Sequence, residues 1–195
     1  LPAGELIPKA ERRRAPKTAK LAVEVAQQAC EMAGADSGNI ASVFTSVLAD
    51  SELSDQICRA LALPQKMMSP TKFHNSVQNA PAGYWAIGAG NHAPCTYIGA
   101  FRESWSLALL EAAAQCVSEQ RPVLLAGYDI TNKPPMSDVC TIAANFGCAL
   151  LLEPSTEANP LATIDITIAT DRCDEMRAAH PELQPLVLLD AIRRL

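Results

Sequence analysis

Residues 69 to 129 read SPTKFHNSVQNAPAGYWAIGAGNHAPCTYIGAFRESWSLALLEAAAQCVSEQRPVLLAGYD. Within this stretch, Asn79-Ala80-Pro81 can open a helix, because Asn favours the N-cap and Pro fits the first turn. Gly88 and Gly90 are placed to end that helix. Cys95 to Gly99 is short and rich in β-forming residues, so we expect a strand there.

The second part of the stretch predicts a buried helix followed by a buried strand. Ser104 to Gln120 is apolar on nearly every side, which is typical of a buried helix. Val123 to Gly127 is continuously apolar, as parallel strands covered on both faces are. The segment from Gly99 to Ser104 then forms a tight turn between a strand and a buried helix. This is the geometry of a nucleophile elbow, so we expect any chemistry of the chain at this turn.

Elsewhere, hydrophobic periodicity predicts further elements. Residues 1 to 15 are rich in Pro and Arg and are expected to form an extended arm before a single domain, with residues 171 to 195 as a C-terminal extension. The expected helices are Pro16 to Ala33, Ser51 to Leu63 with Asp50 or Ser51 as N-cap, and Pro185 to Leu195. The expected strands are Ile40 to Thr45, Gly147 to Glu153, and Leu161 to Thr170, where apolar and polar residues alternate.

The stretch from Ser69 resembles the N-terminal half of the β-ketoacyl synthases of the thiolase superfamily. The resemblance covers roughly residues 16 to 170 and implies an α/β fold, a single thiolase-like half. That half has a mixed five-stranded sheet covered by helices on both faces, with a buried central helix. The family's second half, which carries two catalytic histidines, has no counterpart here. The resembling residues are Ser69-Pro70, Asn79, Ala82-Gly83, Ala86-Ile87, Gly90, Pro94, Ile98, the buried helix, and Val123 to Gly127.

The elbow departs from this family at the catalytic position. The family places a cysteine directly after the strand, and an ungapped count puts Arg102 there. Arg102 cannot act as a nucleophile, Glu103 suits a helix N-terminus electrostatically, and Ser104 is a natural N-cap residue. The resemblance therefore predicts a degenerate elbow with no catalytic residue. An acyl-transferring or hydrolytic enzyme that uses Ser104 or a cysteine as nucleophile stays open as an alternative.

The resemblance also implies a partner-facing surface. In the family, the strand before the elbow lies at the dimer interface, and the segment matching Thr71 to Phe73 reaches toward the partner's acyl pocket. The candidate interface residues are Thr71, Lys72, Phe73, His74, Asn75, Tyr97 and Ile98. The alternative for these residues is an ordinary role in the core and loops of this chain.

A narrower resemblance rests on His74 to Val77 and Asn79 to Trp85. These residues are similar to the short ketosynthase-like proteins of bacterial aryl polyene pigment clusters. The similarity implies a non-catalytic subunit, like a chain length factor, that forms a heterodimer with an active β-ketoacyl-ACP synthase in fatty acid or polyketide-type biosynthesis. Such a subunit would stabilise the synthase, shape its acyl pocket and meet acyl carrier protein only indirectly. A stand-alone homodimeric binding module is a further alternative.

Composition limits the class of protein and the kinds of partner that the chain can have. The 195-residue chain is 49% hydrophobic and 19% charged, which is typical of a globular domain. Its net charge of −5 argues against nucleic acid as a partner, and Arg12-Arg13-Arg14 is its one basic cluster. The seven cysteines form no C-x-x-C pair, so we expect free thiols in the cytoplasm and neither metal nor cofactor. No apolar run approaches the roughly 18 residues of a membrane span.

Overall fold

The computed structural model describes residues 1–154 and 160–166, and the predicted C-terminal extension and its helix Pro185 to Leu195 lie outside them. The described residues form a mixed sheet of four strands in the order β2-β1-β3-β4. β1 pairs in parallel with β2 and β3, and β3 pairs antiparallel with β4. The strands are β1 (Ala41–Thr45), β2 (Cys95–Ile98), β3 (Val123–Asp129) and β4 (Phe146–Leu152).

The predicted fold class is confirmed, but the predicted fifth strand is not found. Residues 161–166, the described part of the expected strand Leu161 to Thr170, form no strand. Leu161 is 88% and Ile166 is 38% exposed, and Ala162 and Ile164 are only half-buried, so the described part of the alternating pattern has no fully covered face. An alternating pattern indicates a strand only where a neighbouring strand and a core are available to pair with it.

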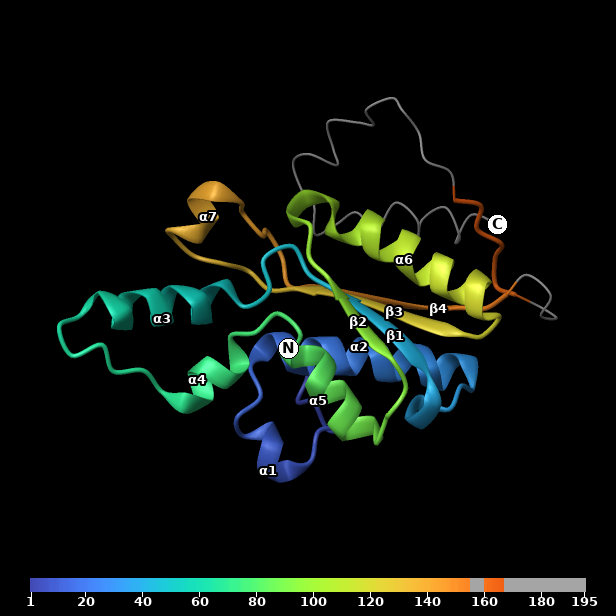
Figure 1. The fold of residues 1–195 in the computed structure, drawn as a ribbon, viewed down its shortest axis with the longest axis horizontal. Coiled ribbons are helices and arrows are strands. Elements are labelled where there is room, and N and C mark those ends of the chain that lie inside the picture. The colour runs from blue at the N-terminus through green and yellow to red at the C-terminus, as the bar shows by residue number, and fades with distance from the viewer. Residues whose placement is uncertain (155–159, 167–195) are drawn as a thin grey trace.

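One face of the sheet is covered by α2 (Lys17–Ala33) and α5 (Ala80–Ala89), as Figure 1 shows. Their core cluster joins Trp85 and Val23 to Phe44 of β1 and Leu124 of β3. Gly90 ends α5 in the left-handed conformation, with φ of 64°, as predicted. The Asn79 side chain, in contrast, makes no capping hydrogen bond.

The opposite face is covered by α6 (Ser104–Glu119), the predicted central helix. Its buried residues Trp105, Ala108, Ala112 and Cys116 pack against β1, β3 and β4. The other side of α6 carries exposed apolar residues, among them Leu107 and Val117. The helix is therefore buried on its sheet-facing side within the described chain, and not all round as its composition suggested.

The N-terminal segment folds onto the body of the protein. Residues 1 to 15 contain the short helix α1 (Lys9–Arg12), and Ile7 lies fully buried in the core cluster under α2 and α5. The Arg12 side chain donates hydrogen bonds to the carbonyl of Ile7 at 3.0 Å and of Glu5 at 2.5 Å. The expected extended arm is therefore wrong, because a buried apolar anchor and an arginine that satisfies free carbonyls fold the segment back.

The remaining helices lie around the sheet. They are α3 (Ser51–Ala62), α4 (Pro70–Asn75) and α7 (Met136–Val139), together with the 3₁₀ turns η1 (Ser37–Asn39) and η2 (Phe101–Glu103). The predicted N-cap of α3 is confirmed, since the Asp50 carboxylate accepts the Leu53 N–H at 2.9 Å. In Figure 1, α3 and α4 extend sideways from the layered body. No helix within the described ranges is long and apolar enough to cross a membrane.

Candidate functional site

The carboxyl ends of the three parallel strands lie at one edge of the sheet. β1 ends at Thr45, β2 at Ile98 and β3 at Asp129, and their parallel pairing brings these ends together. The elbow between β2 and α6 follows at the same edge. In open α/β sheets this edge is where ligands bind and where catalytic groups are placed.

The elbow itself holds no available nucleophile. The Ser104 side chain is 1% exposed, and its hydroxyl accepts the Ala100 N–H at 2.9 Å and donates to the Phe101 carbonyl at 2.7 Å. Both hydrogen bonds close the turn, so the hydroxyl is committed to structure. The left-handed residue of the turn is Phe101, with φ of 52°. It lies one position before Arg102, the residue that the ungapped count places at the family's cysteine. Neither side chain offers a nucleophilic atom.

Arg102 and Glu103 complete the elbow with structural contacts. The guanidinium carbon of Arg102 lies 5.4 Å from the centre of the Phe101 ring, within the range of a cation–π interaction. Glu103 is exposed at the N-cap position of α6, where the helix dipole favours a negative charge. These contacts hold the turn in shape.

Asp129 is a buried acid at this edge of the sheet, and its carboxylate also fixes the backbone. Its Oδ1 accepts the Ser46 hydroxyl at 2.7 Å and the Val47 N–H at 3.0 Å, which ties the end of β3 to the turn after β1. His74 and His92 are exposed, and His74 contacts the Tyr84 ring edge-on at 6.5 Å between centroids. Since both Ser104 hydrogen bonds are to backbone, the described residues assemble no Ser-His-Asp arrangement.

The hydroxyl groups of two tyrosines, Tyr97 and Tyr128, are buried at this edge. Burial, followed by the charge of Asp129, raises the pKa of Tyr97 to about 12. Burial also raises the pKa of Tyr128 well above its usual value. Neither hydroxyl has a hydrogen-bond partner among the described residues. Phenols with raised pKa values stay neutral near pH 7 and are poor general bases.

Four of the described cysteines have pKa values shifted away from nucleophilic reactivity. The six within the described residues are free thiols. Burial raises the pKa of Cys30 and of Cys148 to about 11, and it raises the pKa of Cys95 and Cys116 as well. A catalytic cysteine needs the opposite shift, because the thiolate is the reactive form.

The predicted partner-facing residues fall into two groups. On α4, Thr71, Lys72, Phe73 and His74 are exposed, as an interface requires. Asn75 is instead buried: its amide donates to the Arg14 carbonyl at 2.8 Å, and its carbonyl oxygen accepts the Tyr84 hydroxyl at 3.0 Å. Asn75 therefore fixes α4 to the body of this chain, and we correct its assignment to a structural role.

The second group lies on β2. This strand pairs with β1 and has no second neighbour among the described residues, so one edge of the sheet is open. The side chains of Tyr97 and Ile98 are half-buried and pack against the two core clusters of this chain. What β2 presents outward is unpaired backbone, which is a template for pairing with another chain.

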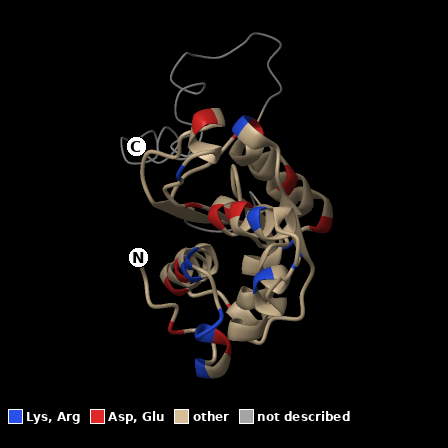
Figure 2. Cartoon of the chain, turned by 90° about the vertical axis from the view of Figure 1, so that its left-hand side faces the viewer, with Lys and Arg blue, Asp and Glu red and all other residues tan. Residues whose placement is uncertain are grey.

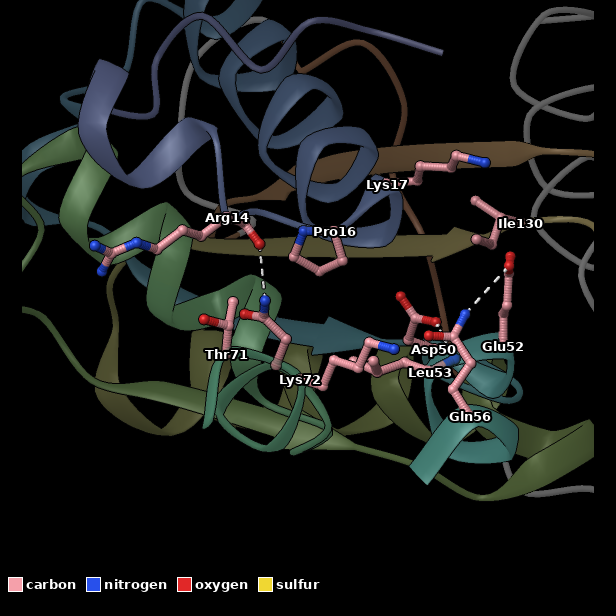
Figure 3. A pocket seen from close by; sticks show the side chains of 11 residues that line it. Arg14, Pro16, Lys17, Asp50, Glu52, Leu53, Gln56, Thr71, Lys72 and Ile130 are labelled. Carbon is pink, nitrogen blue, oxygen red and sulfur yellow. Dashed lines mark hydrogen bonds between the residues drawn. The ribbon is translucent and has the colours of Figure 1, made fainter. Parts of the chain in front are cut away.

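An open cleft of about 280 Å³ lies between the N-termini of α2 and α3 and the exposed side of α4 (Figure 3). Arg14, Lys17 and Lys72 line it together with Asp50 and Glu52, so both charge signs meet there. A small-molecule site is usually enclosed, whereas this cleft is open to solvent. The described part of the chain also holds no cluster of three or more His, Cys, Asp or Glu side chains that could bind a metal ion.

Sequence reasoning missed two features of this region. Nothing in the residue types marked Phe101 as the left-handed residue, because a bulky side chain rarely adopts positive φ. The helix α3 was predicted, but the exposure of Leu61 near its end was not. Leu53 and Ile57, on the same side of α3, are half-buried.

The chain has an α/β sheet in which α6 follows β2 through a tight elbow and packs against the sheet. This arrangement is that of a thiolase-like half, here with an elbow that has no available nucleophile. The chain belongs to the family described as "Beta-ketoacyl synthase, N-terminal domain", whose model matches residues 1–193. The predicted resemblance to ketosynthases is therefore confirmed. No curated protein matches the chain significantly.

Solved structures share this fold. A structure titled as the ketosynthase ApeO in complex with its chain length factor ApeC, from Xenorhabdus doucetiae, matches with TM-score 0.65 and 28% identity over 75% of this chain and 60% of that one. The ishigamide ketosynthase/chain length factor matches with TM-score 0.66 and 14% identity over 82% of this chain and 50% of that one. A β-ketoacyl synthase from Burkholderia phymatum STM815 matches with TM-score 0.59 and 16% identity over 68% and 34%. This chain thus spans about 60% or less of each of these relatives.

Proposed function

We propose that this chain is a non-catalytic subunit, like a chain length factor, that forms a heterodimer with an active β-ketoacyl-ACP synthase. In this role it stabilises the synthase and bounds the pocket that holds the growing acyl chain. The pathway is of the fatty acid or polyketide type, and we place it in aryl polyene biosynthesis in the cytoplasm. Acyl carrier protein then meets the complex through the synthase.

The observation that carries this proposal is the state of the elbow. In a ketosynthase-like fold, the residue that receives the acyl group stands at the start of the helix that corresponds to α6. Here the one hydroxyl at that point, on Ser104, is buried and engaged twice by backbone. A subunit that keeps the fold but cannot accept an acyl group is suited to act through a partner.

The comparisons support the pairing. A solved structure with 28% identity is of a ketosynthase in complex with its chain length factor, so this fold occurs in such complexes. The open edge of β2 and the exposed residues of α4 provide a surface on which a partner can pair and pack. The free, buried thiols fit the reducing environment of the cytoplasm.

The rival reading, an acyl-transferring or hydrolytic enzyme, finds no support in the geometry. It requires either a Ser104 hydroxyl free to attack or a thiol with a lowered pKa. The Ser104 hydroxyl is already engaged in hydrogen bonds that close the turn. Burial raises the pKa of Cys95, Cys30, Cys116 and Cys148, which is the opposite of the required shift.

The test is acyl loading of the complex, followed by intact-mass measurement of both subunits. The ketosynthase encoded beside this chain is co-purified with it and incubated with an acyl-carrier-protein thioester. We expect one acyl group on the ketosynthase and none on this chain. Cys58 and Cys95 are exposed, so a variant with both Cys58→Ser and Cys95→Ser removes adventitious acylation of the exposed thiols among the described residues. A stoichiometric acyl group on this chain in that variant would show that the subunit is an enzyme.

A further inference from the structure

The side of α6 that faces away from the sheet carries an apolar stripe. Four exposed residues follow one another along it at spacings of three, four and three positions: Leu107, Leu110, Ala114 and Val117. This spacing is typical of the seam through which one α-helix packs against another. Leu107 is 45%, Leu110 is 36% and Val117 is 66% exposed, so the described residues leave the stripe uncovered.

The charge around this stripe is acidic. α6 contains Glu111 and Glu119 and no Lys or Arg, and Glu103 stands directly before it. Arg121, just beyond the helix, pairs with Glu119. The end of the molecule that faces the viewer in Figure 2 carries both charge signs, unlike α6. A segment that brings basic residues beside an apolar face therefore suits this surface best.

The chain leaves the sheet beside α6. Leu152, at the end of β4, packs against the core cluster that contains Cys116 of α6. Burial, followed by the charge of Glu153, raises the pKa of Cys116, so the residue after β4 lies near the same part of the helix. In Figure 1, residues 160–166 lie at the end of the molecule where α6 ends. The chain beyond residue 166 therefore starts within reach of the stripe, which spans roughly 15 Å along the helix.

Residues 185–195, PLVLLDAIRRL, have the composition that this surface needs. They are the predicted helix of the C-terminal extension, which lies outside the described residues. They contain two Arg and one Asp, and their apolar residues at helical spacing are Leu188, Ile192 and Leu195. An isolated helix this short is marginal in water, so it needs a surface to pack on. The family model extends to residue 193, which supports treating the segment as part of the same domain.

We propose that residues 185–195 form a helix that packs along the stripe of α6 and completes the core on that side of the sheet. The segment and the stripe belong to one chain, so their effective concentration is on the order of millimolar, which favours this contact over a second copy of the chain in dilute solution. The outer face of α6 is then closed, and a partner is left with β2 and α4. This inference does not depend on the proposed function, since it concerns the chain alone.

The test compares two valines that are equally exposed in the described structure. Val117, on the stripe, and Val139, in α7, are each 66% exposed. Val117→Asp puts a charge into the proposed helix contact, whereas Val139→Asp puts the same charge where no cover is proposed. In urea unfolding of the whole chain, we expect Val117→Asp to lower the folding equilibrium constant at least about tenfold. Val139→Asp should change it less than about threefold.

A second variant tests the segment itself. Ile192→Asp puts a charge on the other side of the same contact, so it should also lower the folding equilibrium constant at least about tenfold. Once Ile192→Asp has released the segment, the stripe is solvated, and adding Val117→Asp should lower the constant less than about threefold further. Hydrogen exchange of residues 185–195, followed by mass spectrometry, should quicken in Val117→Asp and stay unchanged in Val139→Asp.

Three results would overturn the proposal. Equal, small effects of Val117→Asp and Val139→Asp would show that the stripe is free in solution. Losses from Val117→Asp and Ile192→Asp that add in full would show that the segment packs elsewhere. If the free chain is a dimer that Val117→Asp splits into monomers while Ile192→Asp leaves it intact, a second copy covers the stripe in place of residues 185–195.

Discussion

The buried hydroxyl of Ser104 accepts a hydrogen bond from the backbone N–H of Ala100 at 2.9 Å. In a catalytic elbow, the side chain at the start of the helix points toward substrate. Here it points back and closes the turn, and the turn keeps its shape without a reactive atom. The strand-to-helix turn of a ketosynthase half is thereby retained.

The first prediction concerns the stability that this hydroxyl provides. Ser104→Ala removes both hydrogen bonds and leaves the Ala100 N–H without its partner, so we expect a loss of about 1–3 kcal/mol in unfolding free energy. Urea unfolding measures it. Ser118→Ala in the same helix, at an exposed position, should change stability by less than about 0.5 kcal/mol. Unchanged stability in Ser104→Ala would mean that the hydroxyl is free in solution.

The second prediction concerns the packing of α6 on β3. A Cβ at Gly127 would lie 2.8 Å from the Trp105 ring, so Gly127→Ala should destabilise the protein by about 1–3 kcal/mol. Gly83, on the exposed side of α5, has no atom within 4 Å of an added Cβ. Gly83→Ala should therefore stabilise the chain by up to about 1 kcal/mol through helix propensity. Equal effects of the two substitutions in thermal unfolding would contradict this packing.

The third prediction concerns Asp129 and Ser46. Asp129→Ala leaves the Ser46 hydroxyl and the Val47 N–H without their acceptor, and we expect a loss of about 2–3 kcal/mol. Ser46→Ala also removes the acceptor of the Ala49 N–H and should cost about 1–2 kcal/mol. Because the two side chains share a hydrogen bond, the double variant should lose less than the sum. Strict additivity in a double-mutant cycle would argue against the contact.

The fourth prediction concerns alkaline pH. The pKa of Tyr97 is about 12 in the folded chain, against 10 for a free phenol, so folding favours its neutral form. The stability from this shift is fully present below pH 10 and is lost as pH rises from 10 toward 12. Urea unfolding over this range should show the decline, and Tyr97→Phe should decline less steeply. Stability of the Tyr97→Phe variant should still fall with rising pH, because the pKa values of Tyr128, Cys30 and Cys148 are also raised in the folded chain. Identical slopes in wild type and Tyr97→Phe would contradict the buried phenol.

Most of the sheet could be predicted from sequence because its signals are local. The continuous apolar run at Val123 and the small-residue turn after Gly99 each describe a structure that needs no distant information. The prediction of a fifth strand at Leu161 failed because pairing depends on a neighbour that periodicity does not reveal. Ile7 was missed because a single apolar residue among prolines and arginines carries no period, although tertiary packing buries it.

At the candidate site, sequence could predict which reactive groups are present but not where the side chains lie. The absence of a nucleophile at Arg102 follows from residue identity alone. The inward role of Asn75 and the exposure of Leu61 on α3 depend on where the body of the protein lies, which residue types do not reveal. For the same reason Tyr97, expected at an interface, has its ring in the core of this chain.

The most direct test of the central claim is the native mass of this chain, purified alone and after co-expression with the ketosynthase encoded beside it. Light scattering on a size-exclusion column gives the mass of each species. The pairing account predicts a stable complex that contains one copy of this chain for each ketosynthase. A chain that elutes separately from a folded, active ketosynthase at every concentration tested would contradict it.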